Sequence, residues 1–233
     1  MLTRARPSGF ALQTFRFYTR AVTSPSLQAL LTRAGAALER GRGADASQLL
    51  APALRSSTLT RDEELALRSM LAEAALLQDD LDQAASALGR PPDTFRDTVP
   101  SRRLSTLWRL HGRLASARGD QSRAIGLHVR ALKHAETAHD SSAIGLAHYE
   151  LGQCYRQVGD LAILREHITK AASALHAAGD RRTLALVHSL SGVSLAQLGR
   201  NDEAMAALRQ AERLAALVQA DDVLAIVDRK SVV

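Results

Sequence analysis

The stretch AIGLAHYELGQCYRQVGD, from Ala143 to Asp160, decides the fold of this chain. Its apolar and small residues recur with the 3-4-3 spacing that marks one face of a helix. They are Ile144, Ala147, Leu151, Cys154 and Tyr155. Gly159 and Asp160 then supply a C-cap glycine and the N-cap of a second helix over 161–177. The inward positions predicted for that second helix are Ile163, Leu164, Ile168, Ala171 and Leu175. The stretch therefore predicts a helical hairpin.

The hairpin recurs along the chain at a constant interval of about 40 residues, within the range typical of repeat proteins. A glycine of the first helix stands at Gly112, Gly152 and Gly192, and another glycine follows each of them two helical turns later. The register extends backward through Ala72 to Ala34, although the earliest interval is slightly shorter. We expect the first-helix glycine where that helix crosses its neighbour closely. One hairpin cannot bury its apolar face alone, so about five are predicted to stack, followed by a broken sixth.

The boundaries between the predicted helices carry the side chains that end and begin helices. Thr60 and Glu63 have the spacing of a capping box. Asp120, Asp140 and Asn201 are predicted N-caps. Pro91 and Pro92 indicate a longer loop between the second and third hairpins, since proline cannot continue a helix.

These residues resemble the tetratricopeptide repeat, whose pattern is W-x2-L-G-x2-Y followed by A-x3-F and P. The best copy runs from His148 through Leu151 and Gly152 to Tyr155, with histidine in place of tryptophan. Trp108 occupies the tryptophan position of the third hairpin. The interval between hairpins exceeds the usual period of about 34 and resembles longer-helix variants of the family. The resemblance covers 26–227 and implies an all-α, right-handed α-solenoid of antiparallel helical hairpins.

The two ends of the chain differ from the repeats. Residues 1–25 contain Arg, Ser and Thr but no acid, as in a mitochondrial transit peptide, a disordered tail or translated sequence upstream of the true start. Residues 228–233, DRKSVV, resemble the in-frame translation of a sequencing adapter. They begin where the sixth hairpin stops in mid-helix, although a genuine basic terminus is the alternative. We therefore predict a fragment of a longer protein, whose exposed end could support homo-oligomers.

The net charge of +6 is not spread over the repeats. Five arginines precede Glu39, the first acidic residue, and leave 25 basic against 24 acidic residues for the rest of the chain. A nearly neutral array is not expected to bind nucleic acid directly. No apolar run is long enough for a membrane span, and the one cysteine cannot form a disulfide within the chain. The expected compartment is the cytoplasm, or the mitochondrion if the N-terminal segment is a transit peptide.

The side chains that could act in catalysis or bind a metal do not form a recognisable catalytic pattern. The chain has eight histidines but no HExxH motif, and His128, His134 and His139 lack the spacing of helical ligand pairs. Cys154 falls on the inward face of its helix and is expected to be a buried thiol. No phosphate-binding GxxxxGK[ST] motif occurs. We therefore expect neither an enzyme nor a bound metal or cofactor.

A binding surface remains as the expected function. The resemblance implies that the first helices line a concave groove that holds a protein or peptide ligand. The residues it places there are Arg109, Arg113, Tyr149, Gln153, Arg156 and Gln157. Arginine and tyrosine are common at binding hot spots, although ordinary solvated residues are the alternative interpretation. Similar repeats in bacterial multidomain transcription regulators and signalling ATPases imply an interaction or sensor region of a regulatory protein. A stand-alone scaffold or assembly adaptor is the second interpretation.

Overall fold

The computed structural model of the chain describes residues 25–55, 59–92, 101–218, 220 and 223–224. Within these ranges the chain forms ten helices and no strand. They are α2 (Pro25–Glu39), α3 (Gly43–Leu54), α4 (Arg61–Leu77), α5 (Leu81–Leu88), α6 (Ser101–Ala117), α7 (Gln121–Thr137), α8 (Ser141–Val158), α9 (Leu161–Ala178), α10 (Arg181–Gln197) and α11 (Asn201–Leu217). Helices α8 and α9 are the hairpin predicted from the opening stretch.

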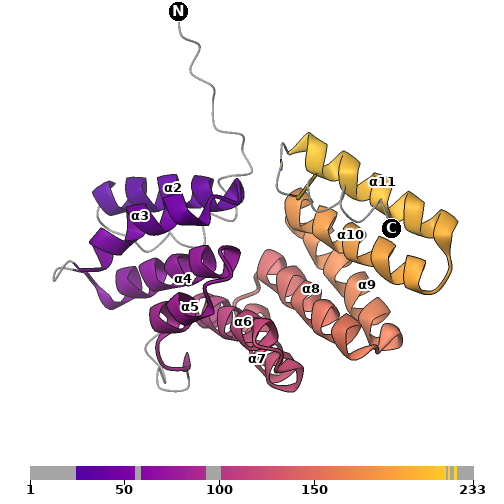
Figure 1. Cartoon of the computed structure of the whole chain (residues 1–233), viewed down its shortest axis with the longest axis horizontal. Coiled ribbons are helices and arrows are strands. Elements are labelled where there is room, and N and C mark those ends of the chain that lie inside the picture. The colour runs from indigo at the N-terminus through magenta and orange to yellow at the C-terminus, as the bar shows by residue number, and fades with distance from the viewer. Residues whose placement is uncertain (1–24, 56–58, 93–100, 219, 221–222, 225–233) are drawn as a thin grey trace, which may run out of the picture.

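The helices stack as consecutive antiparallel hairpins that follow an arc from α2 to α11 (Figure 1). Within each hairpin the two helices pack against each other, and the second helix also packs against the first helix of the next hairpin. The first helices α2, α4, α6, α8 and α10 also contact one another in order. This arrangement confirms the predicted all-α solenoid.

Most hairpin boundaries have the predicted chemistry. Gly159 adopts the left-handed conformation, with φ of 84°, and the Asp160 carboxylate accepts a hydrogen bond from the backbone N–H of Ile163. Aspartates cap four other helices in the same way, and Thr60 and Glu63 form the predicted capping box. The prediction for Asn201 was wrong. Arg200 takes the N-cap position of α11, because the repeat register aligns Arg200, and not Asn201, with Asp160.

The glycines of the first helices mark close crossings, as predicted. A Cβ atom on Gly192 would lie 2.8 Å from Cγ of Leu208 in α11, which leaves no room for a side chain. In the fourth hairpin a different residue packs against the first-helix glycine, because Leu164 stands where the neighbouring hairpins have alanine. Its Cδ1 atom would be 3.3 Å from a Cβ on Gly152. Leu164, Ala171 and Leu175 are fully buried, whereas Ile163 and Ile168 remain partly exposed, so two of the five predicted inward positions are only half-buried.

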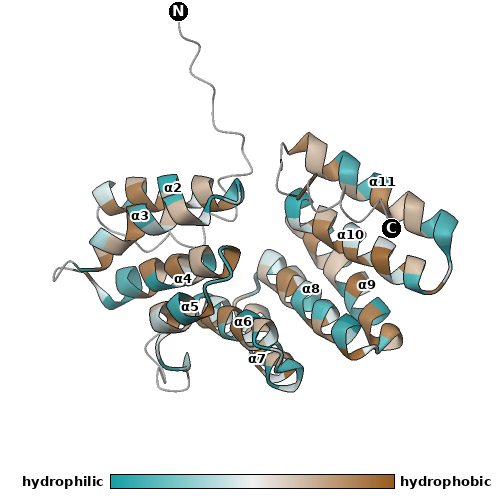
Figure 2. Ribbon diagram, in the orientation of Figure 1, coloured by the Kyte–Doolittle hydropathy of each residue, from teal (hydrophilic) through white to brown (hydrophobic). Residues whose placement is uncertain are grey.

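Leucine and alanine supply most of the core, and each helix also carries hydrophilic residues (Figure 2). A large cluster of buried residues extends from α2 to α6, so the first three hairpins share a core. Trp108 is 3% exposed, and the guanidinium carbon of Arg130 lies 4.8 Å from its ring centroid. Small and medium side chains thus let the helices approach closely along the whole array.

Helix α5 is shorter than the other second helices. It has 8 residues, whereas α7, α9 and α11 have 17 or 18. It ends at Leu88 because Gly89 has a φ of 65° and the two prolines follow. In the fourth hairpin, the last turns of the second helix cover the start of the first helix. These turns are absent from α5.

Several predictions concern residues outside the described ranges. They are the targeting-like or tail character of residues 1–25, the adapter origin of 228–233 and the broken end of the sixth hairpin, all of which stay predictions. Among the residues that are described, no helix has the length and apolarity needed to cross a bilayer.

Candidate functional site

The six predicted groove residues lie on two neighbouring first helices. Arg109 and Arg113 belong to α6, one helical turn apart. Tyr149, Gln153, Arg156 and Gln157 follow the i, i+4, i+7, i+8 pattern along one side of α8. Arg113 lies 3.7 Å from Glu150, the residue after Tyr149, so the two sets lie close together.

Arg109 and Arg113 are held between two carboxylates. Arg109 lies 3.5 Å from Glu73 of α4 and 3.6 Å from Glu150 of α8. Arg113 lies 3.3 Å from Glu73 and 3.7 Å from Glu150. These four residues form an interhelical charge ladder that runs from α4 through α6 to α8. Because both cations are already compensated, and the Arg109 side chain is only 9% exposed, the ladder ties the three helices together and offers no free positive charge.

Sequence reasoning missed the two carboxylates of the ladder. Glu73 occupies the position in the second hairpin that Arg113 occupies in the third, so the repeat register itself places opposite charges on adjacent helices. Glu150 aligns with Leu110 and Leu190, and the register gives no sign that a charge belongs there.

The part of the predicted site on α8 is more accessible. The Gln153 amide donates a hydrogen bond of 2.9 Å to the Tyr149 hydroxyl. Burial, followed by the Glu150 charge, raises the pKa of Tyr149 above its usual 10, so the phenol stays neutral. Arg156 is partly exposed and makes no ion pair with a described residue, and the neutral Gln157 is exposed. This tyrosine–glutamine pair and its neighbours can exchange hydrogen bonds with a ligand.

The histidines take part in packing between helices. Nδ1 of His148 lies 3.0 Å from Nδ1 of His167, and the ring of Tyr155 stacks on His167. Burial, and then the neighbouring His167, lowers the pKa of His148 to about 4. His128 is 1% exposed, and burial likewise lowers its pKa to about 4. In the part of the chain that is described, no three metal-binding side chains come together.

Cys154 is buried, as predicted. Its exposed fraction is 1%, and it packs with Ala115 and Ala124. Burial raises the pKa of its thiol to about 11, although a side-chain hydrogen bond with Ser116 lowers that pKa in part. The thiolate that a nucleophile requires is therefore scarce at neutral pH.

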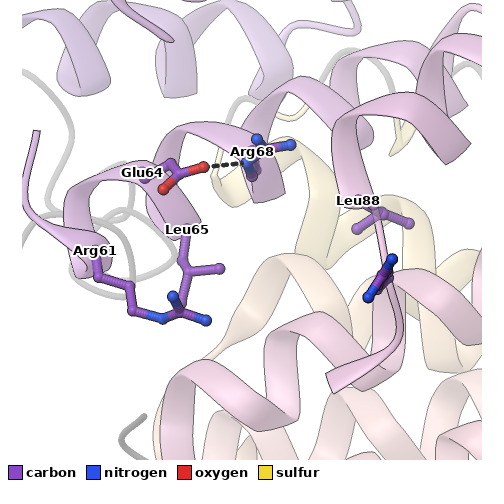
Figure 3. A pocket seen from close by; sticks show the side chains of 7 residues that line it. Arg61, Glu64, Leu65, Arg68 and Leu88 are labelled. Carbon is purple, nitrogen blue, oxygen red and sulfur yellow. Dashed lines mark hydrogen bonds and ion pairs between the residues drawn. The ribbon is translucent and has the colours of Figure 1, made fainter. Parts of the chain in front are cut away.

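A pocket that the sequence did not reveal opens between the start of α4 and the end of α5 (Figure 3). Its volume is about 260 Å³. It is lined by Arg61, Glu64, Leu65, Arg68, Leu88, Gly89 and Arg90. The residues from α4 lie on a different side of that helix from Glu73, so the pocket is separate from the charge ladder.

Several solved structures of other proteins have a similar architecture. A Rap protein in complex with the competence and sporulation factor superposes with a TM-score of 0.76 over 89% of this chain, at 16% identity. A signal-transduction ATPase with a tetratricopeptide repeat sensor, from Pyrococcus horikoshii, superposes with a TM-score of 0.67 over 94% of this chain, at 15% identity. The tetratricopeptide-like repeats of a putative kinesin light chain from Podospora anserina give a TM-score of 0.56 over 83% of this chain, at 19% identity.

The fold is that of a tetratricopeptide-like repeat array. At these identities the likeness concerns the fold alone. The tetratricopeptide-like array spans 59% of the Rap protein and 36% of the signalling ATPase, but 96% of the kinesin light chain repeats. No protein-family model and no curated protein sequence matches the chain.

Proposed function

We propose that the array binds a protein segment or peptide along the surface formed by its first helices, without catalysing a reaction. The observation that carries this proposal is the Tyr149–Gln153 pair, flanked by the accessible side chains of Arg156 and Gln157. First helices that contact one another in order create a continuous surface along which an extended segment can run. Tyrosine and arginine on such a surface supply contact area and directed hydrogen bonds.

The charge ladder reduces the number of residues that we expect to contact the ligand. Arg109 and Arg113 already have anionic partners, so we assign them to positioning α8 rather than to holding a ligand. Ligand contact is then concentrated on Tyr149, Gln153, Arg156 and Gln157. The uncharged tyrosine and the two amides suit the polar backbone of an extended peptide, and Arg156 suits an acidic side chain or carboxylate on it.

The wider context of the proposal is an interaction or sensor region within a larger cytoplasmic regulatory protein, active in signal transduction or transcription control. Two of the structural neighbours support it: a Rap protein complexed with a factor, and a signalling ATPase whose repeats are described as a sensor. The alternative is a scaffold or assembly adaptor, which the kinesin light chain repeats favour. The sequence of the full-length gene separates the two, because an output domain beyond the repeats is expected only for the regulator.

The proposal is tested by selecting peptides that bind the array from a display library and measuring their affinity for variants. Tyr149→Ala and Arg156→Gln should each weaken binding about tenfold, since each removes a hot-spot contact. Arg209→Gln, at an exposed position of the second helix α11, is the matched control and should leave affinity unchanged. Selected peptides whose affinity is the same for all three variants would place the binding surface elsewhere.

A further inference from the structure

The pocket between α4 and α5 has an unusual balance of charge. Three guanidinium groups, from Arg61, Arg68 and Arg90, line it together with a single carboxylate from Glu64. That carboxylate lies 2.7 Å from Nε of Arg68. The Nη1 atom of Arg68 donates a hydrogen bond of 3.4 Å to the carbonyl of Ala87. Arg90 makes no ion pair with any residue that the structure describes. Among the residues that line this cavity, guanidinium groups therefore outnumber carboxylates by three to one.

The shape of the pocket follows from the shortness of α5. In the fourth hairpin, Gly145 occupies the register position of Leu65 and is covered by Leu175, near the end of α9. The corresponding turns do not exist in α5, which stops at Leu88. The side chains of Leu65 and Leu88 consequently face each other across the opening, with Arg61 beside Leu65 (Figure 3). The pocket thus combines two apolar walls with a cationic rim.

The repeat register shows what has changed chemically. Trp108 and Arg130 occupy the positions in the third hairpin that Arg68 and Arg90 occupy in the second, and there the guanidinium lies over the indole ring. In the second hairpin an arginine replaces the tryptophan, so the aromatic ring of that cation–aromatic contact is absent. The Nη1 atom of Arg68 would lie 3.9 Å from a Cβ on Gly89, the residue next to Arg90. Guanidinium groups that line one cavity repel each other, and a bound anion relieves that repulsion.

We propose that this arginine pocket binds a carboxylate or phosphate group carried on a small apolar body. Guanidinium groups pair with both anions through charge-assisted hydrogen bonds, and the two leucines accommodate the apolar part. The site lies on another side of α4 from the surface proposed for peptide binding, so it does not depend on that function.

Isothermal titration calorimetry with the whole chain tests the proposal, using N-acetyl-leucine and phenyl phosphate as the two anionic probes. N-acetyl-leucine amide lacks the charge, and inorganic phosphate lacks the apolar body. At least one of the two anionic probes should bind about tenfold more tightly than both of these reference compounds. Which probe binds more tightly identifies the source of the anion as a carboxylate or a phosphate ester.

Two variants locate the binding. Arg90→Gln should weaken the better probe about tenfold, because it removes one charge-assisted contact from the rim. The exposed Arg209→Gln is the matched control and should bind as the unmodified chain does. Circular dichroism establishes that both variants are folded. Equal binding of the charged probe and its amide, or equal affinities of the two variants, would overturn the proposal.

Discussion

His128 of α7 lies against the backbone of Gly112 in α6. A Cβ atom on Gly112 would fall 2.5 Å from Cε1 of His128, inside any tolerable contact. His128 is 1% exposed, and its Nδ1 atom has no hydrogen-bond partner among the described residues. A polar ring therefore fills the crossing that Leu208 fills opposite Gly192, and the helices can approach there only because Gly112 lacks a side chain.

Gly112→Ala should destabilise the array by about 1–3 kcal/mol, since the added methyl group overpacks a crossing in which the buried His128 ring would have to move. Gly126→Ala is the matched control. Gly126 lies in α7, and no atom stands within 4 Å of the place that a methyl group would take there, so alanine should add up to about 1 kcal/mol through helix propensity. Urea denaturation followed by circular dichroism measures both free energies. Equal effects of the two substitutions would contradict the close crossing.

His128→Leu should stabilise the array by about 1 kcal/mol. Leucine reproduces the Leu208 arrangement in the same register and removes a buried ring nitrogen that lacks a partner. The free energy of unfolding at pH 7.5 is the relevant measurement, because the histidine is neutral there. A loss of stability of similar size would mean that the imidazole makes a favourable contact at this position.

The array should lose stability as the pH falls from about 6.5 towards 4. Burial lowers the pKa of His128 to about 4 in the folded state, whereas the unfolded chain takes up the proton near 6.5. Between these values the unfolded state binds more protons, so acid favours unfolding, and the effect saturates below the folded pKa. Other buried histidines act in the same direction, including His148.

His128→Leu isolates the contribution of this one histidine. Between pH 7.5 and 4.5 the variant should lose about 2 kcal/mol less stability than the unmodified chain, given the size of the pKa depression. Urea melts at the two pH values provide the comparison. Identical losses in both proteins would assign the acid sensitivity to other groups.

Glu73→Ala and Arg109→Ala should show a coupling energy of about 1 kcal/mol in a double-mutant cycle of stability. Their ion pair is largely shielded from solvent and joins two hairpins. Glu166 and Lys170 form the comparison pair, since both side chains are more than half exposed within one helix. Their coupling should be smaller than that of the Glu73–Arg109 pair, because solvent screens exposed charges. A ladder coupling no larger than that of the comparison pair would show that the buried position adds nothing.

The hairpins were predictable because their signals are local and repeated. Gly159 and Asp160 mark a boundary through backbone conformation and capping, which depend on a few adjacent residues. Cys154 was predictable as a buried residue because helical spacing alone assigns its face. Asn201 was predicted as an N-cap because asparagine is a better capping residue than arginine. The repeat register favoured Arg200, which is the N-cap in the structure.

The chemistry between hairpins was less predictable. Glu150 is conspicuous only after α6 and α8 are seen side by side, because its arginine partners lie in another hairpin. The arginine pocket depends on where α5 stops, and propensity does not specify how much of the neighbouring helix is then uncovered. Such features arise from long-range packing and are absent from any short stretch of sequence.

The charge ladder makes the order of the hairpins matter. Arg109 and Arg113 each lie close to Glu73 on one side and to Glu150 on the other, so moving the third hairpin elsewhere in the array would separate both arginines from both acids. Hairpins with similar apolar faces are therefore not interchangeable building blocks. A permuted array assembled from the same hairpins would keep its leucine and alanine contacts but lose these ion pairs between hairpins. The ion pairs therefore specify the position of the third hairpin within the stack.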